Sequence, residues 1–151
     1  RAAVDDLELA EMGRLLRRFF HPMDDFLQCN MNMPDMQEFI IPLAKAFAKL
    51  QQSTAMIAQK GLKNPDEAGA ASSDYLRQFA LVALGYMWAR MAKVAAAKLA
   101  TDTDPGKKEF YESKIKTARF FFERMLPEAD ARQKMVLSGA KSLMDLEETA
   151  F

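Results

Sequence analysis

The chain has 151 residues, half of them hydrophobic, and its 21 lysines and arginines are balanced by 21 aspartates and glutamates. This length suits one domain with a sizeable core, and zero net charge argues against nucleic acid or an anionic membrane as a partner. The single cysteine, Cys29, excludes an internal disulfide, so we expect a cytoplasmic protein. The longest apolar run, residues 79–89, is too short for a membrane span of about 20 residues.

In the first part of the chain, apolar residues recur every three or four positions, which predicts helices and no sheet. The first predicted helix should kink or break at Pro22, because proline cannot donate a helical hydrogen bond. Asparagines and a proline at residues 30–34 then predict a connection. A second helix is predicted over residues 35–61, with a local bend at Pro42.

The middle of the chain holds its most apolar segment. Residues 64–66, Asn-Pro-Asp, make a turn or open the third helix, which we place at residues 74–100. The first half of that helix is apolar nearly all round, which is typical of a helix surrounded by others, so we expect it to be central.

The last part of the chain begins at a clear break, TDTDPG, over residues 101–106. A fourth helix from Lys107 should end at Pro127, and a fifth, shorter segment should cover residues 128–138 before Gly139. The predicted fold is an all-α, antiparallel up-and-down bundle of four main helices plus a shorter fifth, in a single domain over residues 1–151. The fourth helix should present one apolar stripe of Tyr111, Ile115, Ala118, Phe122 and Met125.

Catalytic and metal-binding residues are not predicted. His21 is the only histidine, and no glutamate lies three residues before it, so the Glu-x-x-His pairs of a di-iron bundle cannot form. Cys29 is too far along a helix from His21 to act with it as a nucleophile pair, and we expect a buried or idle thiol. The adjacent Asp24 and Asp25 point apart on a helix, which predicts surface charges. The glycines form no phosphate-binding cluster, so we expect no cofactor in this chain.

Two further features have a plain structural interpretation. Arg14, Arg17 and Arg18 form a small basic patch beside Phe19 and Phe20, and a solvated face is favoured over contact with phosphate or CoA. The eleven methionines could shape an adaptable apolar pocket, although packing in the core is favoured.

Three consecutive phenylalanines mark a candidate docking surface. On a helix, residues 120–122 sweep about 200°, so they cannot all face one core. Phe122 belongs to the predicted stripe and Phe121 can widen it, which leaves Phe120 to meet something else. With Trp88 and Tyr86 it forms the predicted docking surface. The alternative is that Phe120 packs beneath the C-terminal tail, which ends in Leu146 and Phe151.

Four stretches carry a family resemblance: DYLR at residues 74–77, ALGYMWARMA at 83–92, TARFFFER at 117–124 and GAKSLM at 139–144. They resemble the added helical C-terminal domain of one subgroup of acyl-CoA dehydrogenases, the 3-methylmercaptopropionyl-CoA dehydrogenase-like enzymes. Residues 1–60 match only in helical pattern. The chain opens at Arg1 within a helical pattern and without a methionine, which favours a fragment of a larger flavoenzyme.

The resemblance implies that FAD, the acyl-CoA substrate and a catalytic glutamate belong to the parent protein. That glutamate lies in a Tyr-Glu-Gly-Thr motif upstream of this domain, and Tyr111-Glu112-Ser113 is not that motif, so no catalytic or FAD-binding residue is transferred. The domain would brace the catalytic portion of the same polypeptide, shape access to its site or extend a subunit interface. Two other hypotheses stay open: a stand-alone helical module that binds an acyl chain or similar apolar ligand, and a structural bundle that forms a homo-oligomer.

Overall fold

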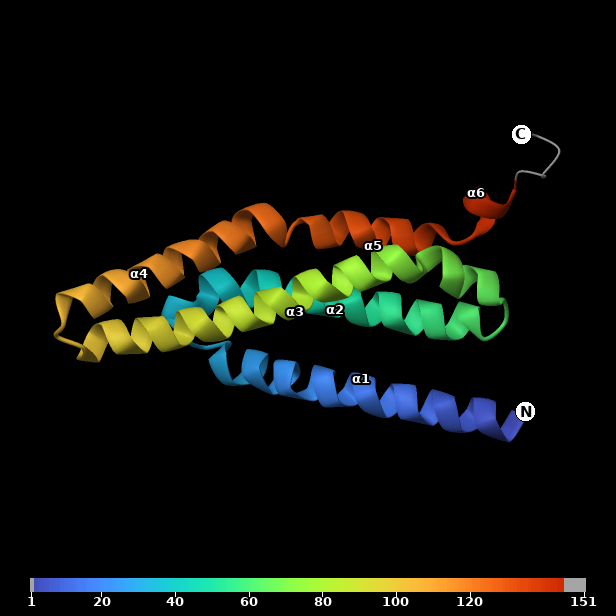
Figure 1. The fold of residues 1–151 in the computed structure, drawn as a ribbon, viewed down its shortest axis with the longest axis horizontal. Coiled ribbons are helices and arrows are strands. Elements are labelled where there is room, and N and C mark those ends of the chain that lie inside the picture. The colour runs from blue at the N-terminus through green and yellow to red at the C-terminus, as the bar shows by residue number, and fades with distance from the viewer. Residues whose placement is uncertain (1, 146–151) are drawn as a thin grey trace.

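The computed structural model describes the backbone of residues 2–145 and the side chains of residues 13–145. Within these residues the fold is all-α, as predicted, with successive long helices running in opposite directions (Figure 1). The elements are α1 (Ala2–Asn30), the 3₁₀ turn η1 (Pro34–Met36), α2 (Gln37–Gly61), α3 (Pro65–Thr101), α4 (Pro105–Phe120), the π-helical turn η2 (Phe121–Met125), α5 (Glu128–Ser138) and α6 (Lys141–Met144).

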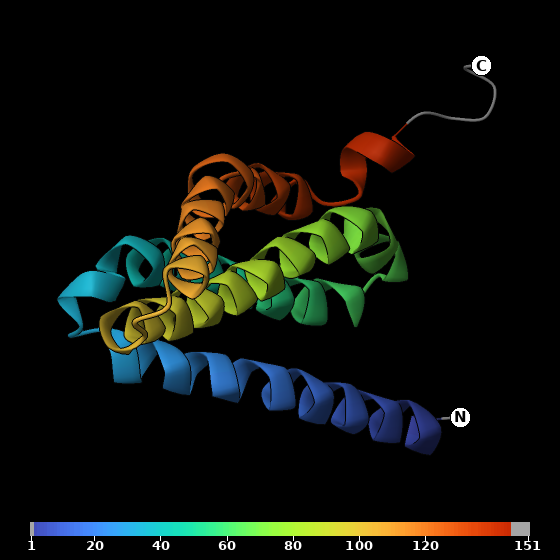
Figure 2. The same ribbon diagram turned by 60° about the vertical axis from the view of Figure 1, so that its left-hand side comes forward.

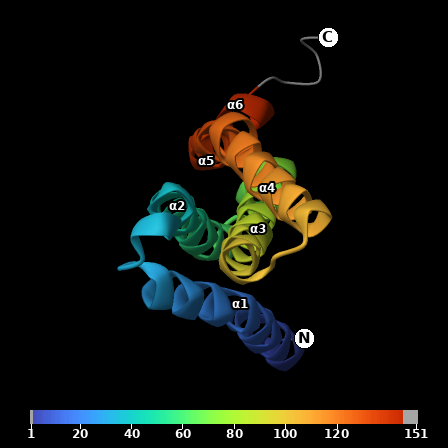
Figure 3. The same cartoon turned by 90° about the vertical axis from the view of Figure 1, so that its left-hand side faces the viewer.

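Four long helical segments surround a shared core: α1, α2, α3 and the segment from α4 to α5. Seen along the long axis, α1 lies on one side of the α2–α3 pair and α4 on the other (Figure 3). Turning the molecule shows α5 continuing beyond α4 along α3, while α1 remains a separate outer helix (Figure 2). The largest fully buried apolar side chains come from α1, η1, α2, α3 and α5: Met23, Met36, Ile40, Leu43, Leu50, Leu81, Val82 and Val136.

The structure differs from the prediction at Pro22 of α1 and, by nine residues, at the start of α3. Of the two outcomes expected at Pro22, a kink or a break, the break is wrong, because helix α1 continues through Pro22 to Asn30. Helix α3 begins at Pro65 instead of residue 74, because the Asn64 side chain accepts a hydrogen bond from the Asp66 amide at 3.1 Å and caps the new helix. Of the two interpretations of residues 64–66, the helix opening is therefore correct.

The turn η2 changes the register of the last part of the bundle. The Leu126 amide donates to the carbonyl of Phe121 at 2.9 Å, five residues back, so this turn holds one residue more than an α-helical turn. As a result Leu126 faces the core and Met125 is 38% exposed. The prediction that Met125 continues the buried stripe of the fourth helix is therefore wrong, while Ala118 and Phe122 are buried as expected.

Helix α3 is the most apolar element of the described chain. By length and composition alone it could cross a membrane, yet the core helix of a water-soluble bundle passes the same test. Its most apolar window is 39% buried within the bundle. In the structure α3 lies between α2 on one side and α4 and α5 on another (Figure 3). Its central position was predicted, and its apolar composition has a packing explanation on those sides.

Candidate docking surface

One face of α3 remains uncovered. Five apolar side chains are exposed along it and form what we call the α3 stripe: Leu76, Leu84, Met87, Met91 and Val94. At 100° per residue they fall within about 80° of one another, on the side of the helix away from buried Gly85 and Ala89. The expectation that other helices surround α3 is thus wrong on this face, because these five side chains stay at least 39% exposed.

A groove of about 470 Å³ lies where the C-terminal part of the α3 stripe meets α4. We call it the α3–α4 groove. It is lined by Met87, Arg90, Met91, Val94, Ala95, Phe110, Tyr111 and Lys114. Two cations flank its apolar floor: the Arg90 guanidinium lies 5.3 Å from the centre of the Tyr86 ring, and the Lys114 ammonium lies 5.0 Å from the centre of the Phe110 ring. Both distances are those of cation–π contacts.

The three phenylalanines divide as the sequence predicted. Phe121 and Phe122 are buried, and the Phe122 ring meets Phe39 of α2 edge-on at 5.3 Å between ring centres. Phe120 is 58% exposed. It lies two residues after fully buried Ala118, so it projects about 200° around the helix from the core side. The tail that was its alternative partner lies outside the described residues from residue 146 onward.

The other two residues of the predicted docking surface do not join Phe120. Tyr86 is only 7% exposed, its hydroxyl donates to the carbonyl of Pro22 at 3.3 Å, and its ring packs edge-on against Phe26. Its assignment to a docking surface is therefore wrong, because its side chain holds α1 onto α3. Trp88 is half-buried and packs against the core. Of the three, Phe120 alone has the exposure that docking requires.

The polar candidates of the first half of the chain lie at the surface. His21 and Cys29 are both exposed. Of the two interpretations of Cys29, a buried or an idle thiol, the buried one is therefore wrong; Leu27 and Asn30 occupy the inward positions of that turn. No group of three or more His, Cys, Asp or Glu side chains suited to a metal ion occurs within the described residues.

A second apolar pocket, of about 410 Å³, lies between α1 and the α2–α3 pair. Its polar feature is the hydrogen bond between the hydroxyls of Tyr75 and Thr54, at 2.7 Å. Burial raises the pKa of the Tyr75 hydroxyl, although the hydrogen bond to Thr54 acts in the opposite direction. Tyr75 therefore stays protonated and serves as a bridge between α2 and α3. The pocket is lined by Leu15, Leu16, Phe19, Thr54, Ile57, Ala58, Tyr75 and Phe79.

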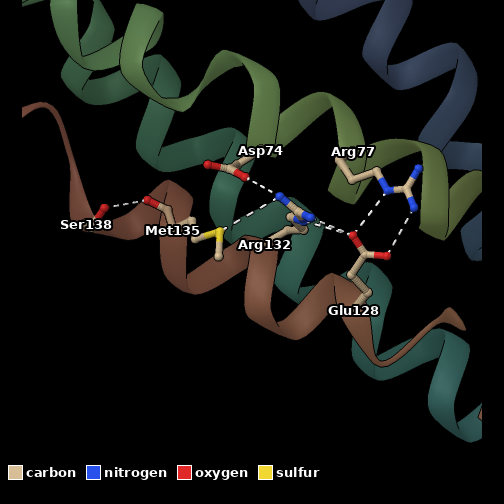
Figure 4. A network of polar contacts seen from close by, with 6 residues as sticks. All are labelled: Asp74, Arg77, Glu128, Arg132, Met135 and Ser138. Atoms are coloured by element: carbon tan, nitrogen blue, oxygen red, sulfur yellow. Dashed lines mark hydrogen bonds and ion pairs between the residues drawn. The ribbon is translucent and has the colours of Figure 1, made fainter. Parts of the chain in front are cut away.

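A network of ion pairs joins α3 to α5 (Figure 4). Arg132 of α5 donates to Asp74 of α3 at 2.9 Å and to Glu128 at 2.8 Å, and Arg77 of α3 donates to Glu128 at 3.1 Å. Hydrogen bonds from Arg77 and then Arg132 hold the pKa of Glu128 below its ordinary value of 4.5. The network orients α5 along α3, and we expect it to stabilise the folded chain. We assign it a structural role and no catalytic one.

This network predicts a pH-dependent contribution to stability. Because the pKa of Glu128 is lowered in the folded chain, the stabilisation is present above its ordinary value of 4.5 and is lost as the pH falls below it. We expect Arg132→Gln to lower the Tm by a few degrees near neutral pH and by less at about pH 3. Thermal melts followed by circular dichroism measure this, with Lys116→Gln as the control. An equal loss at both pH values would contradict the assignment.

The described residues do not fit the FAD that the resemblance implies for the parent protein. A phosphate cradle needs backbone amides that converge on an anion. Gly139 is the one described residue with a positive φ, and the carboxylate of Glu67 lies 2.8 Å from where a Cβ on it would stand. An anionic phosphate there would meet a carboxylate. The other glycines of residues 13–145 are spread over α1, α2, α3 and α4, and the two that share a helix, Gly69 and Gly85 of α3, are 16 residues apart.

The bundle can now be placed in a family. Residues 19–147 match the family described as acetyl-CoA dehydrogenase C-terminal like, and the chain belongs to this family. Among proteins of known activity it is similar to the broad-specificity linear acyl-CoA dehydrogenase FadE5 of Mycobacterium tuberculosis, with 29% identity over 115 residues. The matched segment covers 72% of this chain and 19% of that relative, so the chain spans about a fifth of its length. The resemblance to the C-terminal domain of an acyl-CoA dehydrogenase is confirmed.

Proposed function

We propose that this chain is an accessory C-terminal domain of an acyl-CoA dehydrogenase and has no catalytic centre of its own. In this proposal the remaining portion of the polypeptide binds FAD and oxidises acyl-CoA thioesters. Support comes from the family match over residues 19–147 and from a relative, itself an acyl-CoA dehydrogenase, that is about five times longer than the matched segment. The described side chains are suited to packing and docking.

The observation that carries the docking role is the exposure of Phe120. A phenylalanine that is 58% exposed at the junction of α4 and η2, beside two buried phenylalanines, leaves apolar area in water. Fully burying such a side chain contributes about 1.5–3 kcal/mol, which is enough to anchor a contact between two parts of one polypeptide. The domain would thereby brace the catalytic portion, shape access to its site or extend a subunit interface.

Substitution of Phe120 tests the docking role. Phe120→Ser should leave the thermal unfolding of the 151-residue chain nearly unchanged and weaken its association with the separately expressed catalytic portion by about tenfold or more. Isothermal titration calorimetry measures the association. Leu62→Ser is the matched control, because Leu62 is 65% exposed and lies in the connection between α2 and α3. Unfolding of Phe120→Ser would instead place Phe120 in the core, and unchanged association would place the contact elsewhere.

Removal of the domain from the full-length enzyme distinguishes the three roles. Loss of FAD and a lower Tm would indicate bracing, a changed KM with unchanged stability would indicate access to the acyl-CoA site, and dissociation of subunits in sedimentation would indicate an interface. An enzyme unchanged in all three measurements would contradict an accessory role.

A further inference from the structure

The α3–α4 groove has the size of a small-molecule site. Its volume of about 470 Å³ falls within the range of roughly 300–1,000 Å³ that ligand pockets occupy. A stable protein contact buries about 800 Å² on each partner, which is more than this groove offers by itself. Met87 and Met91 form part of its floor, and their unbranched side chains can repack around a flexible alkyl chain.

The charges around the groove have one sign. Its lining holds two cations, Arg90 and Lys114, and no carboxylate. Within the described residues neither cation forms an ion pair, and the contact recorded for each is with an aromatic face. Each side chain can therefore turn toward an anion at the rim without giving up a carboxylate partner. One cation comes from α3 and the other from α4, so they approach the groove from both walls.

The excess of positive over negative charge continues along the sequence of α3. From residue 75 to residue 101 there is no aspartate or glutamate, although the whole chain has as many acidic as basic residues. The same stretch carries four positive charges: Arg77, Arg90, Lys93 and Lys98. An apolar surface that is free of carboxylates and bordered by cations complements a molecule with an apolar body and an anionic end.

We propose that the α3–α4 groove binds a single-chain amphiphile with an anionic head group, such as a phosphate or carboxylate. The alkyl chain lies on Met87, Met91, Val94 and Phe110, and the head group lies between Arg90 and Lys114. This site is separate from Phe120 and does not depend on the proposed accessory function.

Calorimetric titration of the 151-residue chain with dodecyl phosphate, below its micelle-forming concentration, tests the site. We expect one-to-one binding, at least tenfold weaker binding of octyl phosphate because less apolar area is buried, and at least tenfold weaker binding of dodecyl trimethylammonium. The Arg90→Gln, Lys114→Gln double variant should weaken dodecyl phosphate binding at least tenfold, and Met91→Gln should weaken it as well. Lys116→Gln, an exposed charge on α4 outside the groove, is the matched control.

Three results would overturn the proposal. The first is equal binding of the anionic and cationic amphiphiles, which would show unspecific apolar association. The second is unchanged binding in the double variant with a normal circular dichroism melt. The third is binding to phosphatidylglycerol vesicles without binding to dodecyl phosphate, which would make this face a membrane-surface contact.

Discussion

Leu43→Ala is expected to lower the free energy of unfolding by about 2–5 kcal/mol. Leu43 is fully buried on α2 and lies where three parts of the bundle meet. A Cβ placed on Gly85 of α3 would stand 3.3 Å from a methyl group of Leu43 and 3.4 Å from one of Leu126. Removing the Leu43 side chain leaves a cavity at this point, and surrounding helices cannot collapse into it fully.

Urea unfolding followed by circular dichroism measures the effect of Leu43→Ala. Ile41→Ala is the matched control, since Ile41 is exposed on the same helix and its loss should cost less than about 1 kcal/mol. Adding Gly85→Ala to Leu43→Ala tests the assigned geometry. The methyl group that Gly85→Ala introduces is crowded by the Leu43 side chain when Leu43 is present, and it has room when Leu43 is replaced by alanine. We expect a coupling of about 0.5–3 kcal/mol between the two sites, and additive effects would contradict the contact.

Gly139→Ala is expected to cost about 1–3 kcal/mol. Gly139 ends α5 with φ +75° and ψ −173°, a region that is essentially restricted to glycine. A Cβ there would also lie 2.8 Å from a carboxylate oxygen of Glu67, so the side chain would have to displace that group. Both effects should appear as a lower midpoint in urea unfolding.

Two further variants make the Gly139 prediction specific. In a Glu67→Ala background the steric part disappears and the backbone strain stays, so Gly139→Ala should still destabilise, though by less. Gly69→Ala should act in the opposite direction by about 0.5–1 kcal/mol, because Gly69 lies within α3 with open space around it. Equal effects of the two glycine substitutions would show that position 139 is not constrained as described.

Much of the fold could be predicted because proline, glycine and asparagine mark its breaks. The fifth helix has the predicted bounds, Glu128–Ser138, and the second begins two residues from its predicted start. The π-helical turn could not be predicted, since periodicity assumes 100° per residue and a single extra residue turns every later side chain. The start of α3 was ambiguous because small residues at 68–73 suit either a turn or a helix.

The candidate site was predicted only in part, for a physical reason. Phe120 could be identified because three adjacent aromatic residues exceed what one buried face can hold. Tyr86 could not be excluded, because its burial depends on Pro22 and Phe26 of α1, some 60 residues earlier in the chain. The groove cations Arg90 and Lys114 come from different helices, and the absence of acidic residues from residues 75–101 was the available signal.

The measurement that tests the central claim most directly is the sequence of the reading frame upstream of Arg1 in the source DNA. The account predicts a continuous frame that encodes a catalytic portion with a Tyr-Glu-Gly-Thr motif. A start codon directly before Arg1 would contradict the accessory-domain proposal, and the bundle would then be an independent protein.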